Sequence, residues 1–230
     1  MSVTINARFP GPYSTTTYVN TTLGSGSNRA LALMAYQNRT PPNINTTAPT
    51  FNGVSGHVIT GFSLSNRALQ LCYWLDSELP SSAGSYELTW GASAGGVSAS
   101  LLECTGINQS TPVRTYYNSY TEFPTGITGS GTTQSINNLS TAHTGDLLVG
   151  CFYQSPGSAT IGGSGATTVE YSSVTYALFD SVDAGAHTLD LTPVKDMSTR
   201  WWIAAALASA DASSSLISVY SRGSNTILRA

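Results

Sequence analysis

Residues 73–89 read YWLDSELPSSAGSYELT, and residues 176–192 read YALFDSVDAGAHTLDLT. Each stretch consists of an apolar run, an Asp-Ser pair, a short loop, an Ala-Gly pair and a second run in which apolar and polar residues alternate. In Tyr86–Trp90 the alternation is strict, which is the pattern of a strand with one face buried. The first stretch therefore predicts two strands joined by a loop, and its recurrence predicts that this unit occurs twice.

The flanking sequence extends the repeat in the same order. Residues 30–38 (ALALMAYQN) are similar to 146–155 (DLLVGCFYQS), and residues 98–106 (SASLLECTG) are similar to 200–209 (RWWIAAALAS). Neither half ends in a clear linker. The repeat therefore predicts one sandwich with two related halves rather than two separate domains.

The run Arg200–Ala208 is ambiguous between helix and strand. Its alanines favour a helix. A face with a period of two favours a strand, and this face contains Trp201, Ile203, Ala205 and Leu207. We interpret the run as a strand.

The remaining apolar runs are also short and separated by turn residues, and Asn52-Gly53 is a strong hairpin signal. No run sustains the 3.6-residue period of a helix. The predicted fold class is all-β, an antiparallel β-sandwich or jelly roll with two related halves. We expect an N-terminal arm or edge strand at 1–23, a single jelly-roll sandwich at 24–210, and a C-terminal tail or returning strand at 211–230. Residues 105–143 are the longest stretch expected to be irregular.

Charge is scarce in this chain of 230 residues, which has 9 Lys+Arg and 12 Asp+Glu. Lys195 is the only lysine, whereas there are 33 Ser, 30 Thr and 13 Asn. A hydrophobic fraction of 40% and a net charge of -3 argue against disorder, and so few cations argue against nucleic-acid binding. No apolar run is long enough for a membrane-spanning helix, so we expect no membrane insertion.

The N-terminus has no apolar segment typical of a signal peptide. A surface rich in Ser, Thr and Asn is nevertheless typical of proteins that work outside cells. Virion components, which assemble in the host cytoplasm and are released by lysis, combine these two properties. We therefore expect a virion location.

The cysteines, carboxylates and histidines that could act in catalysis or metal binding have simpler structural interpretations. Cys72, Cys104 and Cys151 lie in apolar runs and are interpreted as reduced core thiols, with a disulfide or metal site as the alternative. Two carboxylate pairs follow strands and are interpreted as turn-capping groups, with calcium binding and glycoside hydrolysis as alternatives. These pairs are Asp76 with Glu78 and Asp180 with Asp183. His57, His143 and His187 accompany no recognisable nucleophile motif, so we predict no catalytic, cofactor-binding or metal-binding residues.

The stretch 105–143, expected to be irregular and rich in Ser, Thr and Asn, contains four aromatic residues: Tyr116, Tyr117, Tyr120 and Phe123. Three interpretations remain open for them. The loop can pack on its own sandwich, contact another subunit or a capsid, or stack on a glycan.

The C-terminal tail is too apolar for a free end. Its apolar residues include Leu216, Ile217, Tyr220, Ile227 and Leu228. The tail either returns as an edge strand of the same domain or reaches a neighbour by strand addition.

The order of these segments resembles a jelly-roll domain of tailed-bacteriophage virion proteins and of large bacterial surface proteins. The resemblance spans about 26–208 and rests on a G-x-x-R-x-L strand, an F-x-G hairpin, a Y-W-L strand, an A-G-x-x-x-L strand, a G-x-x-Q-x-x-P loop and a G-D-L-L strand. The residues that carry it are Gly26, Arg29, Leu31, Phe51, Gly53, Tyr73, Trp74, Leu75, Ala83, Gly84, Leu88, Gly106, Gln109, Pro112, Gly145, Asp146, Leu147 and Leu148.

The resemblance implies a structural or adhesive role and no reaction. It makes the chain similar to capsid decoration (cement), head-fibre or tail-associated proteins. The implied partners are the major capsid protein or other virion proteins, together with further copies of the chain, for example in a trimer. The alternative is a carbohydrate-binding adhesin domain of a phage fibre or bacterial surface protein.

Overall fold

The computed structural model describes residues 3–13, 16–22, 27–38, 42, 44, 47–64, 66–90, 97–118, 134–136, 143, 145–155, 159–162, 166–171, 174–182, 189–193 and 199–210. Antiparallel strands account for most of these residues, and the predicted all-β sandwich class is confirmed. Within the described ranges, no helix has the length and apolar character needed to cross a membrane.

The first half of the chain forms two sheets. We call the five-stranded one the first inner sheet and the four-stranded one the first outer sheet. The first inner sheet has the order β1 (Thr4–Tyr13), β9 (Val97–Thr105), β3 (Ala30–Asn38), β7 (Arg67–Leu75) and β6 (His57–Leu64). The first outer sheet has the order β2 (Thr16–Thr21), β8 (Gly84–Thr89), β4 (Thr50–Phe51) and β5 (Val54–Ser55).

The second half also forms two sheets, named in the same way. The second inner sheet has the order β10 (Val113–Asn118), β17 (Thr199–Leu207), β12 (Asp146–Ser155), β15 (Val174–Val182) and β14 (Ala166–Tyr171). The second outer sheet has the order β11 (Gln134–Ile136), β16 (Leu189–Pro193) and β13 (Ala159–Gly162).

The internal repeat predicted from the sequence is confirmed by this topology. The strands β10, β17, β12, β15 and β14 occupy the places that β1, β9, β3, β7 and β6 occupy in the first half. Likewise, β11, β16 and β13 take the places of β2, β8 and β4. Each pair of similar segments therefore forms equivalent strands.

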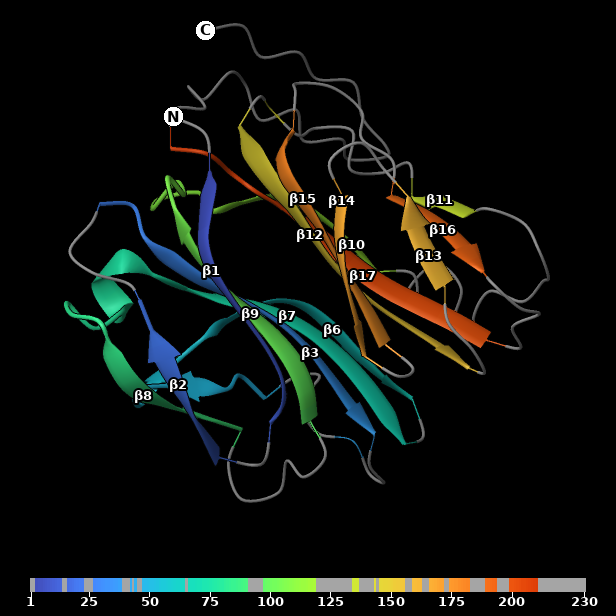
Figure 1. Cartoon of the computed structure of the whole chain (residues 1–230), viewed down its shortest axis with the longest axis horizontal. Helices are drawn as coiled ribbons and strands as arrows, with labels where there is room; N and C mark the ends of the chain where they lie inside the picture. The colour runs from blue at the N-terminus through green and yellow to red at the C-terminus, as the bar shows by residue number, and fades with distance from the viewer. Residues whose placement is uncertain are drawn as a thin grey trace, which may run out of the picture.

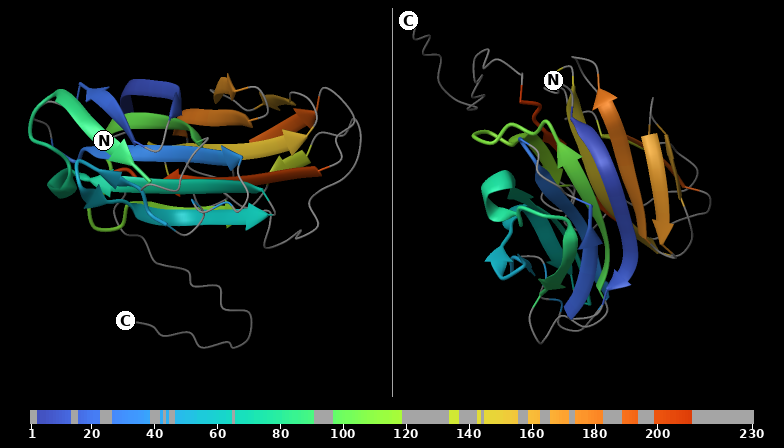
Figure 2. Two further views of the ribbon diagram at one scale, coloured as in Figure 1. Left: turned by 90° about the horizontal axis from the view of Figure 1, so that it is seen from below. Right: turned by 60° about the vertical axis from the view of Figure 1, so that its left-hand side comes forward.

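The four sheets stack in four layers. From lower left to upper right, Figure 1 shows the first outer, first inner, second inner and second outer sheets, and the turned views of Figure 2 agree. The expected N-terminal segment 1–23 contributes β1 and β2, which lie at the edges of the first inner and first outer sheets. Each half thus has its own pair of sheets, and the two inner sheets pack on each other.

Strand β3 shows why the sequence signal for the central strands is a continuous apolar run. Successive side chains of a strand point to opposite faces. Met34 and its even-numbered neighbours enter the core between the two inner sheets. Leu33 and its odd-numbered neighbours enter the core between the first inner and first outer sheets. Both faces of β3 are therefore buried, and no polar face is left to alternate.

The core between the two inner sheets joins the halves, and we call it the shared core. Its members from both halves include Met34, Leu71, Leu102, Leu147, Val149, Ile203 and Leu207, all nearly inaccessible to solvent. Burying apolar surface contributes about 25 cal/mol per Å². Hydrophobic burial is therefore the main force holding the halves together.

Several local predictions are confirmed. Residues 200–207 lie in strand β17, not in a helix. Asn52 and Gly53 have φ of 50° and 77°, the positive values that a two-residue hairpin turn of this type requires. Cys72, Cys104 and Cys151 are all buried thiols outside any disulfide.

The expectation of an irregular stretch from 105 onward is wrong for residues 113–118, which form β10. Pairing with β17 provides the missing partner, joining Tyr116 to Ala205 and Tyr117 to Ala204. The alternation of polar and apolar residues in VRTYYN is weak, so only this long-range pairing reveals the strand.

Candidate functional site

A groove lies where the outer strand β6 of the first inner sheet meets the outer strand β10 of the second inner sheet. Its volume is about 490 Å³. The residues that line it are Val58, Ile59, Tyr73, Val113, Arg114, Thr115 and Tyr116. We call it the interhalf groove, because each half supplies one wall.

A buried hydrogen bond fixes the distance between the two strands beside the groove. The amide nitrogen Nδ2 of Asn118 in β10 donates to Oγ1 of Thr60 in β6 at 3.0 Å and to the carbonyl oxygen of Gly61 at 3.3 Å. Asn118 and Thr60 are each 8% exposed. Desolvated hydrogen bonds of this kind are costly to leave unmade, so they hold the strands in register.

The two tyrosines of β10 point to opposite faces of the strand. Tyr116 lines the groove and is 57% exposed. Tyr117 is 7% exposed and stacks on Trp202, with ring centroids 6.3 Å apart. Tyr117 therefore packs on its own sheet, and Tyr116 is the one of the pair that a ligand or partner can reach.

Tyr73 forms the opposite wall together with Val58 and Ile59. Its ring stacks on that of His57 at a centroid distance of 5.0 Å, and His57 Nε2 lies 2.6 Å from Oε1 of Glu78. Burial raises the pKa of the Tyr73 phenol above its ordinary value, and the charge of Glu78 and the nearby Cys72 raise it further. The Tyr73 hydroxyl therefore stays protonated at neutral pH and can donate a hydrogen bond.

Arg114 supplies a cation whose charge is compensated inside the protein. Its Nε donates to Oδ2 of Asp146 at 2.6 Å and its Nη2 donates to Oδ1 at 3.2 Å. Asp146 is fully buried and also accepts hydrogen bonds from the backbone N–H groups of Ser209 and His143, both at 2.8 Å. Arg114 and Asp146 thus form a neutral pair beside the groove.

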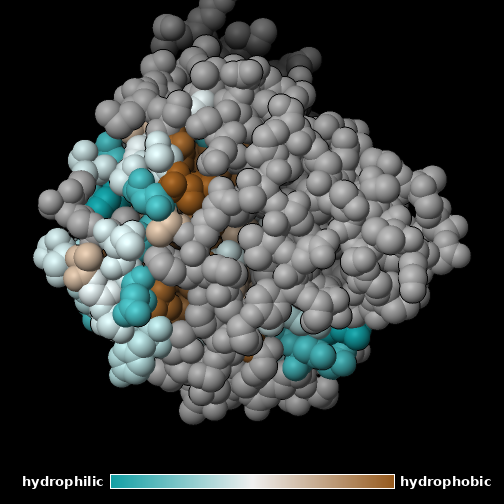
Figure 3. All heavy atoms as spheres, viewed as in Figure 1, coloured by the Kyte–Doolittle hydropathy of each residue, from teal (hydrophilic) through white to brown (hydrophobic). Residues whose placement is uncertain are grey.

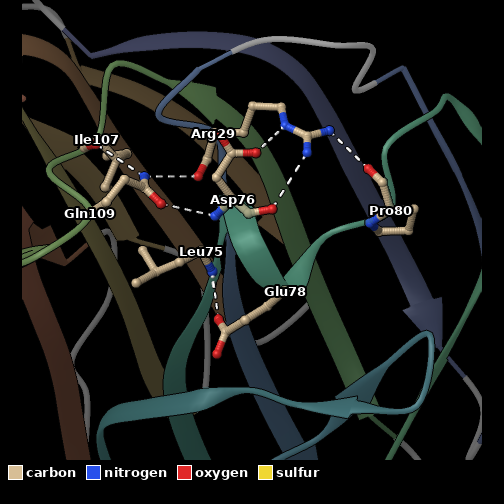
Figure 4. A network of polar contacts seen from close by, with 7 residues as sticks. All are labelled: Arg29, Leu75, Asp76, Glu78, Pro80, Ile107 and Gln109. Carbon is tan, nitrogen blue, oxygen red and sulfur yellow. Dashed lines mark hydrogen bonds and ion pairs between the residues drawn. The ribbon is translucent and has the colours of Figure 1, made fainter.

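The carboxylate pair Asp76 and Glu78 has a structural role at the end of β7 (Figure 4). Asp76 accepts from Nε of Arg29 at 2.5 Å, and Glu78 accepts from the backbone N–H of Leu75 at 2.7 Å. Gln109 completes the network by accepting from Asp76 N–H at 2.9 Å and donating to the Arg29 carbonyl at 3.1 Å. These contacts favour turn capping over calcium binding or glycoside hydrolysis.

The same network attaches the segment between the halves. Asn108 N–H donates to the Ala208 carbonyl at 2.8 Å, and Ala210 N–H donates to the Gly106 carbonyl at 2.7 Å. Because Gln109 binds the first half and Asn108 binds the second, the connecting segment is held by both.

The other residues predicted to contact a partner lie outside the described residues, so their role stays a prediction. They are Tyr120, Phe123, Leu216, Ile217, Tyr220, Ile227 and Leu228. Asp183 and His187 also lie outside them. Among the described residues, no group of three His, Cys, Asp or Glu could hold a metal ion.

Sequence reasoning missed most of the interhalf groove. It singled out Tyr116 but placed Tyr73 only within an apolar run, and it did not consider Val58 or Arg114. The groove exists only because two segments from different halves pack together. No local pattern in either segment could have indicated it.

Comparison of the chain with protein-family models, with curated proteins and with solved structures finds no match.

Proposed function

We propose that the chain is a structural protein of a tailed-bacteriophage virion, and specifically a capsid decoration protein that binds and stabilises the capsid surface. We also infer that each half is a jelly roll. In the first half, the order β1-β9-β3-β7 faces the order β2-β8-β4-β5, so the first and last strands lie side by side in one sheet. This strand order supports the inference, since a jelly roll places eight strands in two facing sheets.

The observation that carries the proposal is the near absence of charge on the sheet edges. Charged side chains, especially lysine, are one of the means by which native proteins keep exposed edge strands from pairing. The charged residues in the outer strands of the four described sheets are Arg8 in β1, Arg114 in β10 and Glu170 in β14. None of these strands contains a lysine. Edges of this composition suit a protein whose neighbours cover them in an assembly.

The visible surface of the first half supports the same interpretation. In Figure 3 most of the coloured residues are pale, near the middle of the hydropathy scale, and strongly hydrophilic residues occur in a few places. A surface of this kind loses little solvation energy when a neighbour covers it.

Strand β2 provides a specific contact candidate within the N-terminal segment. Tyr18 is 69% exposed on this edge strand, which has no charged residue. Tyrosine is one of the residues that most often dominate interface energies. We propose that Tyr18 and the β2 edge contact the capsid or a neighbouring copy, and that Tyr120, Phe123 and the apolar residues of the C-terminal tail add to this contact.

Self-association completes the proposal. Copies arranged around a capsid symmetry axis, for example as a trimer, would bind several lattice sites at once, and this avidity strengthens binding without new contacts.

The test is binding to particles that lack the protein. Purified chain should co-sediment saturably with such particles and raise the temperature at which they release DNA. Tyr18→Ala should weaken particle binding about tenfold or more, since loss of a central aromatic anchor has an effect of this order. Soluble protein that leaves the particles unbound and unchanged would contradict the proposal.

A further inference from the structure

We propose that the interhalf groove binds an uncharged saccharide, with the Tyr116 ring as the stacking surface. This inference goes beyond capsid binding and does not depend on it, because the groove and the β2 edge are different surfaces.

One wall of the groove presents an exposed aromatic ring. Tyr116 is 57% exposed at the rim of the groove, and Val58 on the facing strand is 38% exposed. A tyrosine ring presents an apolar face and a polar hydroxyl. One face of a sugar ring carries C–H groups and its edge carries hydroxyls, so it can pack on such a ring while keeping its hydroxyls available.

The groove also contains residues with hydrogen-bonding side chains. Tyr73 and Thr115 are among the residues that line the groove, and each carries a hydroxyl group that can donate and accept. Small-molecule sites commonly combine apolar and aromatic walls with a few polar groups of this kind. Hydroxyl groups that serve in both roles suit sugar hydroxyls, which also do both.

The cationic side chain that lines the groove is already paired with a carboxylate. The guanidinium of Arg114, which lines the groove, is held bidentately by the buried carboxylate of Asp146. Because Asp146 already compensates the charge of Arg114, an anionic ligand would find no unpaired cation among the residues that line the groove. The Arg114–Asp146 pair therefore favours an uncharged ligand.

The groove has the size of a small-molecule site, and a hydrogen bond holds its walls in place. A volume of about 490 Å³ falls within the range of small-molecule sites, roughly 300–1,000 Å³. The Asn118–Thr60 hydrogen bond holds the two walls at a fixed distance. A preformed groove loses less entropy on binding than one that must close.

The experiment uses the full chain on a printed array of uncharged hexose and N-acetylhexosamine oligomers, with sialylated and sulfated oligomers alongside. The strongest uncharged oligomer is then titrated by calorimetry against purified variants. Tyr116→Ala should weaken binding about tenfold or more, whereas Tyr116→Phe, which keeps the ring, should bind within about threefold of wild type. The control is Val54→Ala, which truncates an exposed apolar side chain on β5 of the first outer sheet, outside the groove lining, and it should bind like wild type.

Three results would overturn the proposal. They are absence of binding to every uncharged oligomer, binding that Tyr116→Ala leaves intact, and binding confined to acidic oligomers. If Tyr116→Ala abolishes particle binding while no oligomer binds, the groove is a protein contact instead. Because particle binding is measured separately and should depend on Tyr18, failure of either proposal can be recognised without the other.

Discussion

At the scale of single residues, Asp146 is a buried charged group that depends on several hydrogen-bond partners. Its carboxylate is fully buried and accepts hydrogen bonds from Arg114 and from two backbone N–H groups. Removing one partner of a buried ion pair leaves the other charge uncompensated. Asp146 therefore joins the end of β12, the end of β17 and the wall of the groove.

We predict that Asp146→Asn lowers the free energy of unfolding by about 3–5 kcal/mol in urea denaturation. Adding Arg114→Met should recover part of this loss, because it removes the uncompensated cation. Glu87→Gln, a carboxylate change on an outer sheet, is the control and should stay within about 0.5 kcal/mol of wild type. Equal stability of the Asp146→Asn variant and wild type would show that the pair contributes little.

The cysteines provide a second test at this scale. Burial raises the pKa values of the Cys72 and Cys151 thiols well above their ordinary values. The unfolded chain therefore releases these protons at a lower pH than the folded chain, and stability is lost as the pH rises past about 8.5. We predict that the free energy of unfolding decreases between about pH 8 and pH 9.5, and that the decrease is smaller in a Cys72→Ala/Cys151→Ala variant. A decrease of the same size in both proteins would contradict this account.

At the scale of elements, the edge strand β2 has one edge that is not paired with another strand of its sheet. It pairs with β8 on one side only, and Asn20 is exposed on it. A lysine on an edge strand opposes pairing with another strand, because its charge would have to be desolvated.

We predict that Asn20→Lys weakens particle binding and self-association about tenfold without changing the melting temperature by more than a few degrees. Light scattering measures self-association and co-sedimentation measures particle binding. Ser77→Lys, at an exposed position in η1 (Asp76–Glu78), adds the same charge away from any edge and should behave like wild type. If both lysine variants weaken binding equally, the effect is one of net charge and not of the edge.

Strand β10 shows the limit of local patterns at this scale. Its residues read as a loop because apolar and polar side chains do not alternate clearly. The strand forms because β17 pairs with it and because Tyr117 and Asn118 are buried against Trp202 and Thr60. Residues in β17 and β6 supply these contacts, and both segments lie far from β10 in the sequence.

At the scale of the whole molecule, the shared core makes the two halves depend on each other. The shared core contains residues of β3, β7 and β9 from the first half and of β12 and β17 from the second. Separating the halves would expose the apolar faces of both inner sheets to water, which is strongly unfavourable. We therefore expect the chain to unfold as one unit.

We predict that Leu147→Ala, in the second half, lowers the stability of both halves by about 2–5 kcal/mol. The measurement follows exposure of the Cys72 thiol, which lies in the core of the first half, together with total fluorescence across a urea gradient. Both should shift to lower urea by the same amount. Val54→Ala, which truncates an exposed side chain, should shift neither. A Cys72 transition that stays at its wild-type midpoint would mean that the halves unfold independently.

Most strand segments, the repeat, the hairpin at Asn52-Gly53 and the buried thiols follow from the sequence, because each depends on neighbours along the chain or on simple alternation. The four-layer stack and the groove do not. They arise because a continuous apolar run such as Ala30–Asn38 indicates burial on two faces but cannot say which sheet covers each face. Tyr116 and Tyr117 are adjacent in sequence and chemically identical. Only the packing of β10 between β17 and β6 leaves one exposed and buries the other.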